Sequence, residues 1–190
     1  MRTFVAIALT HEIQNYLAGI QETLKKTQAD IKWVQPENIH LTLKFLGERK
    51  EKKIEQIKEI LEETVKDKTC FSLRLSHLGA FPKIDYPRVI WVGIDKGKEE
   101  IERIAYELEE QIAKIGIPKE DKPFSSHITI ARLKSPLNRE KLVGALKRVE
   151  CAEEKELRVE KITLYKSTLT PKGPIYEVLK ESPLLRQSEE

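Results

Sequence analysis

The chain has 190 residues, 39% of them hydrophobic, and its 34 Lys and Arg against 31 Asp and Glu give a formal net charge of +3. A chain of this length can bury a core without disulfides or metals, and no apolar run is long enough to span a membrane. The small positive excess permits a polyanionic partner without requiring one, because Lys and Glu are interspersed along the predicted helices.

Apolar periodicity predicts the elements of the first half of the chain. Alternation of apolar and polar residues indicates strands, whereas apolar residues three and four positions apart indicate helices. Thr10 has the side chain and the position of an N-cap. The predicted elements are a strand at Thr3–Leu9, a helix at Thr10–Lys26, a strand at Ile31–Val34, a strand from His40, a helix at Glu51–Lys66 and a strand at Phe71–Leu75.

The second half has the same alternation of signals. Gly and Pro predict loops at Gly79–Pro87 and Gly116–Ser126, and Asn138 is a candidate N-cap. The residues after Pro183 are expected to fray. The predicted elements are a strand at Val89–Val92, a helix at Glu99–Ile115, a strand from His127, a helix after Asn138 and strands at Leu157–Val159, Ile162–Tyr165 and Ile175–Leu179.

Two tetrads with an HxTx pattern, His40-Leu41-Thr42-Leu43 and His127-Ile128-Thr129-Ile130, carry the chemistry. On a strand, residues i and i+2 point to the same face, so each His stands beside a Thr while the apolar residues face a core. If the two strands lie side by side, one cleft contains two titratable imidazoles and two hydroxyl donors. These groups suffice for acid–base chemistry on a phosphate.

The tetrads belong to an internal repeat. The two histidines are 87 positions apart, and each is followed by a helical stretch and then by two alternating runs at matching distances. A duplicated unit of this kind predicts two lobes related by a pseudo-two-fold axis. Such an axis would bring the two tetrad strands face to face.

The remaining histidines and the tryptophans have simpler interpretations. His11 lies in the first turn of a predicted helix and is expected at the surface, and His77 has no Thr partner and is expected in a structural or rim position. Trp33 and Trp91 are predicted core aromatics. A four-histidine metal site is disfavoured, because no two histidines have the spacing of metal ligands and no acidic residue recurs beside them.

The stretches Trp33–Glu48 and Phe124–Arg132 resemble the two-histidine (2H) phosphoesterases, and among them the RNA 2′,3′-cyclic phosphodiesterases once named 2′-5′ RNA ligases. The similarity covers nearly the whole chain, including the N-terminal strand and Tyr165–Leu169. It implies a single bilobal domain over residues 1–190. It also implies an α+β fold in which two antiparallel sheets flank a central cleft and helices lie outside.

The resemblance also implies a reaction, the hydrolysis of an RNA 2′,3′-cyclic phosphate end to a 2′-phosphate without a metal or other cofactor. Water must lose a proton as it attacks phosphorus, and the departing 3′ oxygen must gain one. By the resemblance His40 is the proton donor and His127 the proton acceptor. The symmetry of the sequence alone does not assign these two roles.

The resemblance places three further residues on the phosphate. Thr42 and Thr129 would donate hydrogen bonds to its non-bridging oxygens. Arg132 would bind it as a bidentate ligand. Strict alternation points Arg132 away from the His127 face, so it reaches the cleft only if the strand twists, bulges or ends there, and otherwise it is a surface charge.

Two residues after the first tetrad are open to two interpretations each. Lys44 lies on the histidine face by parity and either contacts the RNA backbone or is solvated. Phe45 lies on the apolar face and is predicted to be a core residue, although an exposed ring could stack on a base.

Two alternatives to hydrolysis stay open. The chain could be a module that binds a nucleotide or an RNA end without turnover, with the imidazoles acting only as hydrogen-bond donors. It could also join a 5′-hydroxyl to the cyclic phosphate, although hydrolysis should win by mass action in dilute water. An RNA with a 2′,3′-cyclic phosphate end, such as a tRNA-like or other small RNA, is the expected partner in each case.

The N-terminus, the cysteines and the paired lobes indicate cellular location and assembly. Met1–Ile7 is too short and too strand-like for a signal peptide, and Cys70 and Cys151 lie in no metal or redox motif. We therefore expect a cytoplasmic protein with reduced cysteines. A self-contained pair of lobes is expected to be a monomer.

Overall fold

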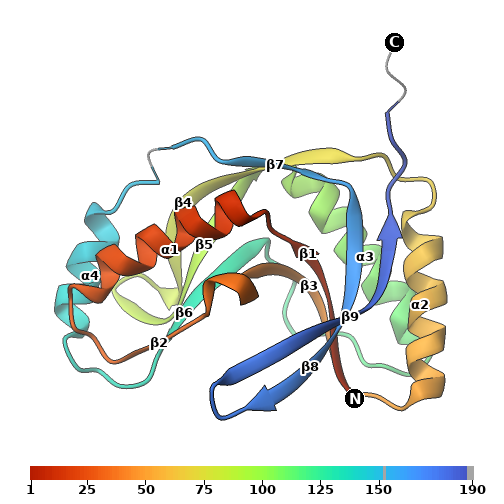
Figure 1. Cartoon of the computed structure of the whole chain (residues 1–190), viewed down its shortest axis with the longest axis horizontal. Coiled ribbons are helices and arrows are strands. Elements are labelled where there is room, and N and C mark those ends of the chain that lie inside the picture. The colour runs from red at the N-terminus through yellow and green to blue at the C-terminus, as the bar shows by residue number, and fades with distance from the viewer. Residues whose placement is uncertain (152, 188–190) are drawn as a thin grey trace.

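The computed structural model describes residues 1–151 and 153–187, which form two antiparallel sheets and four α-helices (Figure 1). The order of the elements follows the predicted repeat. The elements are β1 (Arg2–Ala8), α1 (His11–Lys25), β2 (Ile31–Trp33), the short 3₁₀ helix η1 (Pro36–Asn38), β3 (His40–Glu48), α2 (Glu51–Val65), β4 (Phe71–Lys83), β5 (Tyr86–Lys96), α3 (Lys98–Lys114), β6 (His127–Leu133), α4 (Arg139–Arg148), β7 (Glu156–Val159), β8 (Lys161–Thr170) and β9 (Gly173–Pro183).

The strand order interleaves the two halves of the chain. One sheet has the order β3-β1-β8-β9, and the other has the order β2-β6-β5-β4-β7. Each sheet therefore contains one tetrad strand, β3 or β6, and a long hairpin, β8–β9 or β4–β5. The predicted fold class, a two-lobed α+β fold built from two antiparallel sheets, is confirmed.

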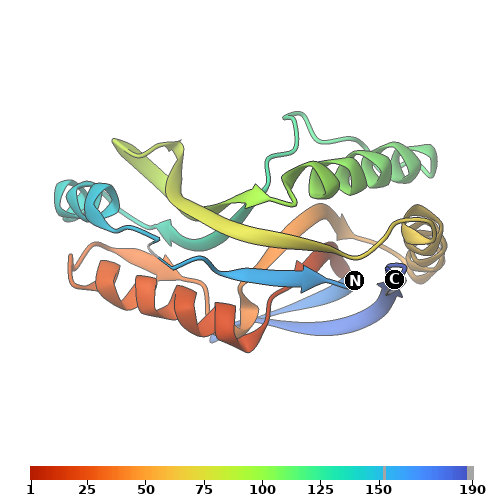
Figure 2. The same ribbon diagram turned by 90° about the horizontal axis from the view of Figure 1, so that it is seen from above.

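The helices lie in two pairs at opposite ends of the molecule, with α1 near α4 and α2 beside α3 (Figures 1 and 2). Helix α1 begins where predicted, because the Thr10 side chain accepts a hydrogen bond from the backbone N–H of Ile13 at 3.4 Å. Its buried residues are Ile13, Leu17, Ile20, Gln21 and Leu24. Burial of one leucine or isoleucine side chain stabilises the fold by about 1.5–3 kcal/mol, so these helices are held mainly by packing.

The apolar residues of both tetrads contribute to the core, as the alternation predicts. Leu41, Leu43, Ile128 and Ile130 are all buried. They join Val5, Ile7, Ile90 and the apolar faces of the helices in one hydrophobic cluster. The histidines and threonines of the tetrads therefore lie on the opposite faces of β3 and β6, away from this core.

The loop predicted at Gly79–Pro87 is wrong. Strand β4 continues to Lys83 and β5 begins at Tyr86, so only a tight turn separates them. The prolines are accommodated because Pro82 and Pro87 face each other beside a register shift, near the end of the hairpin.

The expected fraying after Pro183 is also wrong for the residues that directly follow it. Leu184 is buried, and its N–H donates to the carbonyl of Glu160 at 2.8 Å. Leu185 exchanges backbone hydrogen bonds with Lys68 and Cys70. A single apolar side chain that reaches the core is enough to anchor this segment.

Asn138 occupies the N-cap position of α4, as predicted, but its side chain does not cap the helix. It has φ of 54°, and its amide donates to the carbonyl of Gln28 at 3.0 Å.

Within residues 1–151 and 153–187, no helix is both long and apolar enough to cross a lipid bilayer.

Candidate active site

Each tetrad strand contains a β-bulge at the same point of the repeat. The extra residue is Leu43 in β3 and Ile130 in β6. A bulge moves the following side chains to the opposite face of the strand. Phe45 and Arg132, which strict alternation points away from the histidines, therefore lie on the histidine faces of their strands.

His40 is held at the start of β3 by hydrogen bonds to both ring nitrogens. Its Nδ1 lies 2.6 Å from the carbonyl of Asn38, and its Nε2 lies 2.8 Å from Oγ1 of Thr42. A carbonyl can only accept, so Nδ1 carries the proton and the Thr42 hydroxyl donates to Nε2 when the ring is neutral. This contact is the i, i+2 juxtaposition that the first tetrad predicts.

His127 is oriented in the same way at the start of β6. Its Nδ1 lies 2.7 Å from the carbonyl of Ser125, again two residues earlier, so Nδ1 carries the proton. Within the part of the chain that the structure describes, its Nε2 has no hydrogen-bond partner. Neutral His127 therefore presents a free lone pair, whereas Nε2 of His40 is engaged by Thr42.

Aromatic rings from the hairpins enclose both imidazoles. The His40 ring stacks on Phe4 with centroids 4.8 Å apart and meets the edge of Tyr176, in β9, at 5.4 Å. His127 meets Phe81, in β4, at 5.0 Å in an edge-to-face contact. Each histidine thus lies beside an aromatic residue of the hairpin in its own sheet, a contact that the sequence did not signal.

Burial lowers the pKa of both histidines below the ordinary value of 6.5. The hydrogen bond to the backbone partly opposes this shift in each ring. For His127, the positive charge of Arg132 lowers the pKa further. Both imidazoles therefore favour the neutral form in the free protein, and Arg132 adds a bias against protonation of His127.

The two lobes meet along the two tetrad strands. Strands β3 and β6 belong to different sheets, yet Cα atoms of the two strands approach within 8 Å. Arg132, in β6, acts on the pKa of Tyr176 as well as on that of His127, and the Tyr176 ring contacts His40. A guanidinium from one sheet therefore lies within electrostatic range of the histidine neighbourhood of the other.

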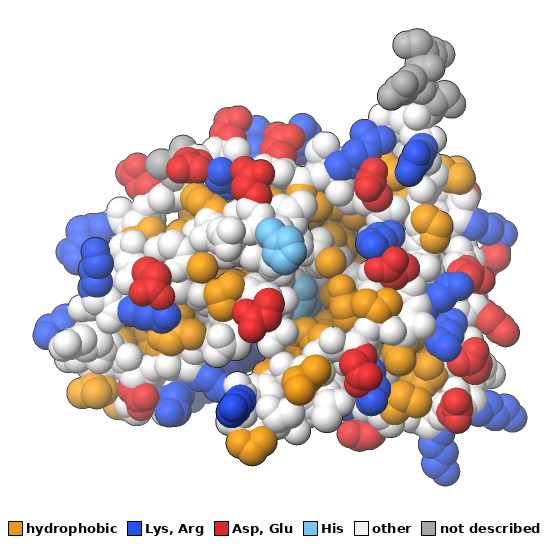
Figure 3. All heavy atoms as spheres, in the orientation of Figure 1, with side chains coloured by type: hydrophobic (Ala, Val, Ile, Leu, Met, Phe, Trp, Pro, Cys, Tyr) orange, Lys and Arg blue, Asp and Glu red, His pale blue; other side chains and the backbone are white. Residues whose placement is uncertain are grey.

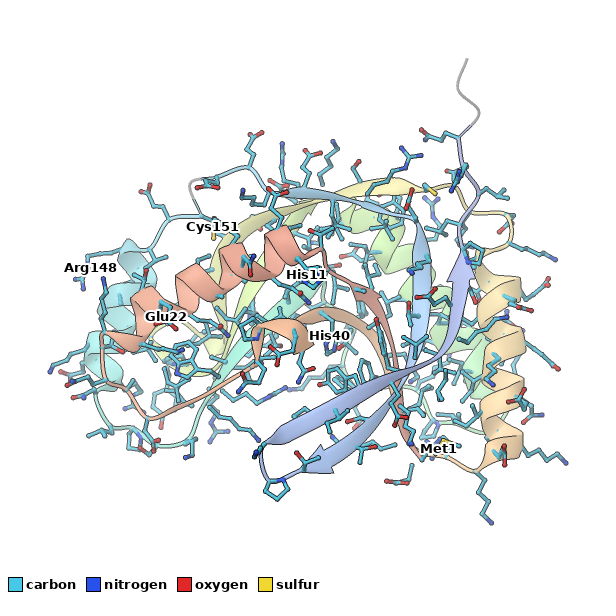
Figure 4. All side chains as sticks on the ribbon, in the orientation of Figure 1. Met1, His11, Glu22, His40, Arg148 and Cys151 are labelled. Atoms are coloured by element: carbon cyan, nitrogen blue, oxygen red, sulfur yellow. The ribbon has the colours of Figure 1, made fainter. Side chains whose placement is uncertain are left out.

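A cavity of about 390 Å³ lies beside His40. Figure 3 shows two histidines near the centre of this face, one standing out from the surface and one partly covered in a hollow beside it, and Figure 4 places His40 between α1 and the β8–β9 hairpin. The walls come from η1, α1 and the hairpin, and Asn38 secures them because its amide donates to the carbonyl of Pro174 at 2.9 Å. The His40 side of the site is thus accessible through a preformed opening.

Phe45 is not the core residue that alternation predicted. Its side chain is 57% exposed, and its ring lies 6.4 Å from that of Phe4, which stacks on His40. The bulge at Leu43 is the reason. The alternative interpretation, an exposed ring near the site, describes its position.

Lys44 is neither solvated nor positioned to contact RNA. It is 3% exposed, and its Nζ lies 2.6 Å from a carboxylate oxygen of Glu109 and 3.2 Å from the carbonyl of Pro118. The same bulge moves it to the core side, where it joins β3 to α3 and to the loop before His127. A buried charge needs partners of this kind.

Trp91 lies on the face of β5 that carries the site rather than in the core. It is paired with Thr129, and its ring packs over Gly79, where an added Cβ would come within 2.2 Å of it. Its centroid is 6.2 Å from that of His127. Trp33 is partly buried against the core, as expected.

The other residues considered in the sequence analysis lie outside this site. His11 is exposed, and exposed His77 lies at the rim, with its ring centroid 6.0 Å from that of Trp91. Both cysteines are free. Among the described residues no three His, Cys, Asp or Glu side chains gather as metal ligands do.

Two lobes, each presenting a His–Thr pair from an equivalent bulged strand, define the class of two-histidine phosphoesterases. The family model described as "LigT like Phosphoesterase" matches residues 7–91 and again residues 92–176, one copy for each half. The chain therefore belongs to the LigT-like phosphoesterase family, as the sequence resemblance predicted.

Curated relatives and solved structures agree with this assignment. A protein of Methanocaldococcus jannaschii named "RNA 2′,3′-cyclic phosphodiesterase" is 39% identical, with 95% of this chain and 99% of the relative covered. A protein of the same name from Methanothermobacter thermautotrophicus is 34% identical over 93% and 95%. The crystal structure of E. coli LigT complexed with 3′-AMP superposes with a TM-score of 0.78 at 26% identity, covering 96% of this chain and 97% of that one.

Proposed function

We propose that this phosphoesterase hydrolyses the 2′,3′-cyclic phosphate at the end of an RNA to a 2′-phosphate, using His40 and His127 and no metal ion. The pair of imidazoles oriented by backbone carbonyls on two converging strands is the observation that carries the proposal. The names of the curated relatives support the choice of substrate.

The hydrogen bonds support the assignment of the two roles. His127 has a free Nε2 lone pair and is disfavoured in its protonated form by Arg132, which suits a base that takes a proton from water. Bound phosphate is anionic and favours protonation of a nearby imidazole. With His127 held neutral, the proton is expected on Nε2 of His40, which then donates it to the departing 3′ oxygen.

The hydroxyl groups and Arg132 stabilise the negative charge that develops on the oxygens of the phosphate. Thr42 and Thr129 donate to the non-bridging oxygens, which gain negative charge as water attacks. Arg132 binds the phosphate from the β6 side, because the bulge has turned it onto the His127 face. Phe45 offers an exposed ring on which the terminal base can stack.

A short RNA ending in a 2′,3′-cyclic phosphate tests the proposal. Incubation with the protein in excess EDTA is expected to give a product with a 2′-phosphate at an undiminished rate, because the proton transfers need no metal. The position of the phosphate is read by ³¹P NMR. Unchanged substrate with measurable binding would favour a binding module, a longer strand would favour a ligase, and loss of activity in EDTA would contradict the metal-free mechanism.

A further inference from the structure

We infer that Lys32, which lies directly opposite the proposed phosphate ligand Arg132, forms a subsite for the phosphodiester that joins the terminal nucleotide to the rest of the RNA, so that the strand leaves the site across β2. This inference rests on the proposed function and adds to it a preference for RNA strands over cyclic mononucleotides.

The two cations are directly opposite each other on neighbouring strands. In the β2–β6 pair, Lys32 faces Arg132. Directly opposed residues on antiparallel strands project to the same face with Cβ atoms about 4.5–5.5 Å apart. The next residue, Trp33, lies under the Lys25 amine of α1 at 5.7 Å and so faces the helix side. Lys32 therefore projects to the other side, together with Arg132 and the site.

The pair lacks compensating negative charge within the described part of the chain. No ion pair there includes Lys32 or Arg132, although Lys134, the residue that follows β6, has a carboxylate oxygen of Asp30 at 3.8 Å. Like charges directly opposite each other destabilise a sheet. Two neighbouring phosphates of an RNA strand, one at each side chain, would reverse that cost, which indicates a binding role for the pair.

The two tetrad strands carry different residues at the equivalent position after the bulge. One of these residues suits a base and the other suits a phosphate. In the four-stranded sheet, the second residue after the bulged Leu43 is Phe45, and it faces Phe4, which in turn faces Tyr165. In the five-stranded sheet, the equivalent residue is Arg132, which faces Val89 of β5 on one side and Lys32 of the additional edge strand β2 on the other. At these two equivalent positions the strands therefore present an aromatic ring in β3 and a cation in β6.

The position of Lys32 points to a second phosphate rather than the reacting one. Strand β6 carries both His127 and Arg132, and β2 is the edge strand beside it. Lys32 therefore lies one strand spacing, about 4.8 Å, beyond the strand that carries His127. Lys32 is also exposed, and β2 has only three residues. An RNA chain can therefore cross this edge without meeting another element of the sheet.

Chain-length dependence tests the inference. The value of kcat/KM is measured for uridine 2′,3′-cyclic phosphate and for a diuridine with the same cyclic end, and their ratio is compared among variants. We expect Lys32→Gln to lower the dinucleotide-to-mononucleotide ratio about two- to fivefold. We also expect it to reduce the slope of log kcat/KM against log salt for the dinucleotide by about 0.7. Lys32→Arg should retain the ratio, and Lys141→Gln, the same change on an exposed lysine of α4, should leave it unaffected.

The outcomes separate this inference from the proposed function. Hydrolysis of neither substrate by the wild-type protein would contradict the proposed function itself. Hydrolysis of both with an unchanged ratio in Lys32→Gln, or an equal loss on both substrates, would overturn the second-phosphate subsite.

Discussion

Replacement of His127 or His40 by alanine is expected to lower kcat for a cyclic-phosphate RNA by about 10²- to 10⁴-fold, which is the usual contribution of one acid or base group. In the proposed mechanism each imidazole performs its own proton transfer, and Ser125 and Asn38, which offer only their carbonyls to the rings, are not expected to replace it. The measurement is a single-turnover rate at saturating enzyme, so that binding defects do not contribute. The two losses should not add in the double variant, because the histidines act as a pair.

The matched control is His11→Ala, which removes an exposed histidine from the start of α1. It should keep wild-type activity, and circular dichroism should show that all three variants remain folded. Activity within threefold of wild type in either the His40 or the His127 variant would remove that histidine from the chemistry.

The second large effect is expected for the hydroxyl groups of the tetrads. Thr42→Val and Thr129→Val preserve the shape of the side chain and remove a donor to the phosphate oxygens, which should lower kcat by about 10²- to 10³-fold each. KM should change much less, because these bonds strengthen as charge develops in the transition state. Steady-state kinetics on the same RNA separates the two parameters.

Thr42→Val has an additional consequence, because the hydroxyl also bonds Nε2 of His40 at 2.8 Å. We therefore expect a larger loss there than in Thr129→Val. Thr23→Val, on the exposed face of α1, is the control, since its hydroxyl bonds only the carbonyl of Gly19 in the same helix. If both tetrad variants raised KM and left kcat unchanged, the hydroxyls would serve ground-state binding alone.

Local pattern was sufficient for the helices, for most of the strands and for the contact between His40 and Thr42. The i, i+2 geometry of a strand requires His40 to stand beside Thr42 whatever the rest of the chain does, and the structure has that contact. The helical stripes were equally local. The predicted helix at Glu99–Ile115, for example, differs from α3 by one residue at each end.

The residues beyond the tetrads could not be placed from alternation, because a bulge depends on the register of the partner strand. One extra residue at Leu43 exchanges the expected faces of Lys44 and Phe45. At Ile130, the equivalent bulge brings Arg132 onto the histidine face. The expectation for Arg132 depended on such an irregularity, and no feature of the residue types there signals one.

Contacts across the fold were also beyond the reach of the sequence. Tyr176 and Phe81 reach the histidines from hairpins that are distant in the chain, and the carbonyls that orient the rings belong to Asn38 and Ser125 irrespective of their side chains. The long β4–β5 hairpin was hidden by its prolines, which usually indicate a loop. These features arise from tertiary pairing rather than from local propensity.

The central claim, that both imidazoles act on one phosphate, is tested most directly by titrating the protein with uridine 2′-monophosphate and following the imidazole signals by NMR. His40→Gln and His127→Gln assign the signals. In the free protein both histidines should titrate below pH 6.5, since burial lowers their pKa, and the bound anion should raise both values. We predict that the two signals shift with one dissociation constant and a 1:1 stoichiometry, whereas a response of only one histidine, or two different dissociation constants, would contradict a shared site.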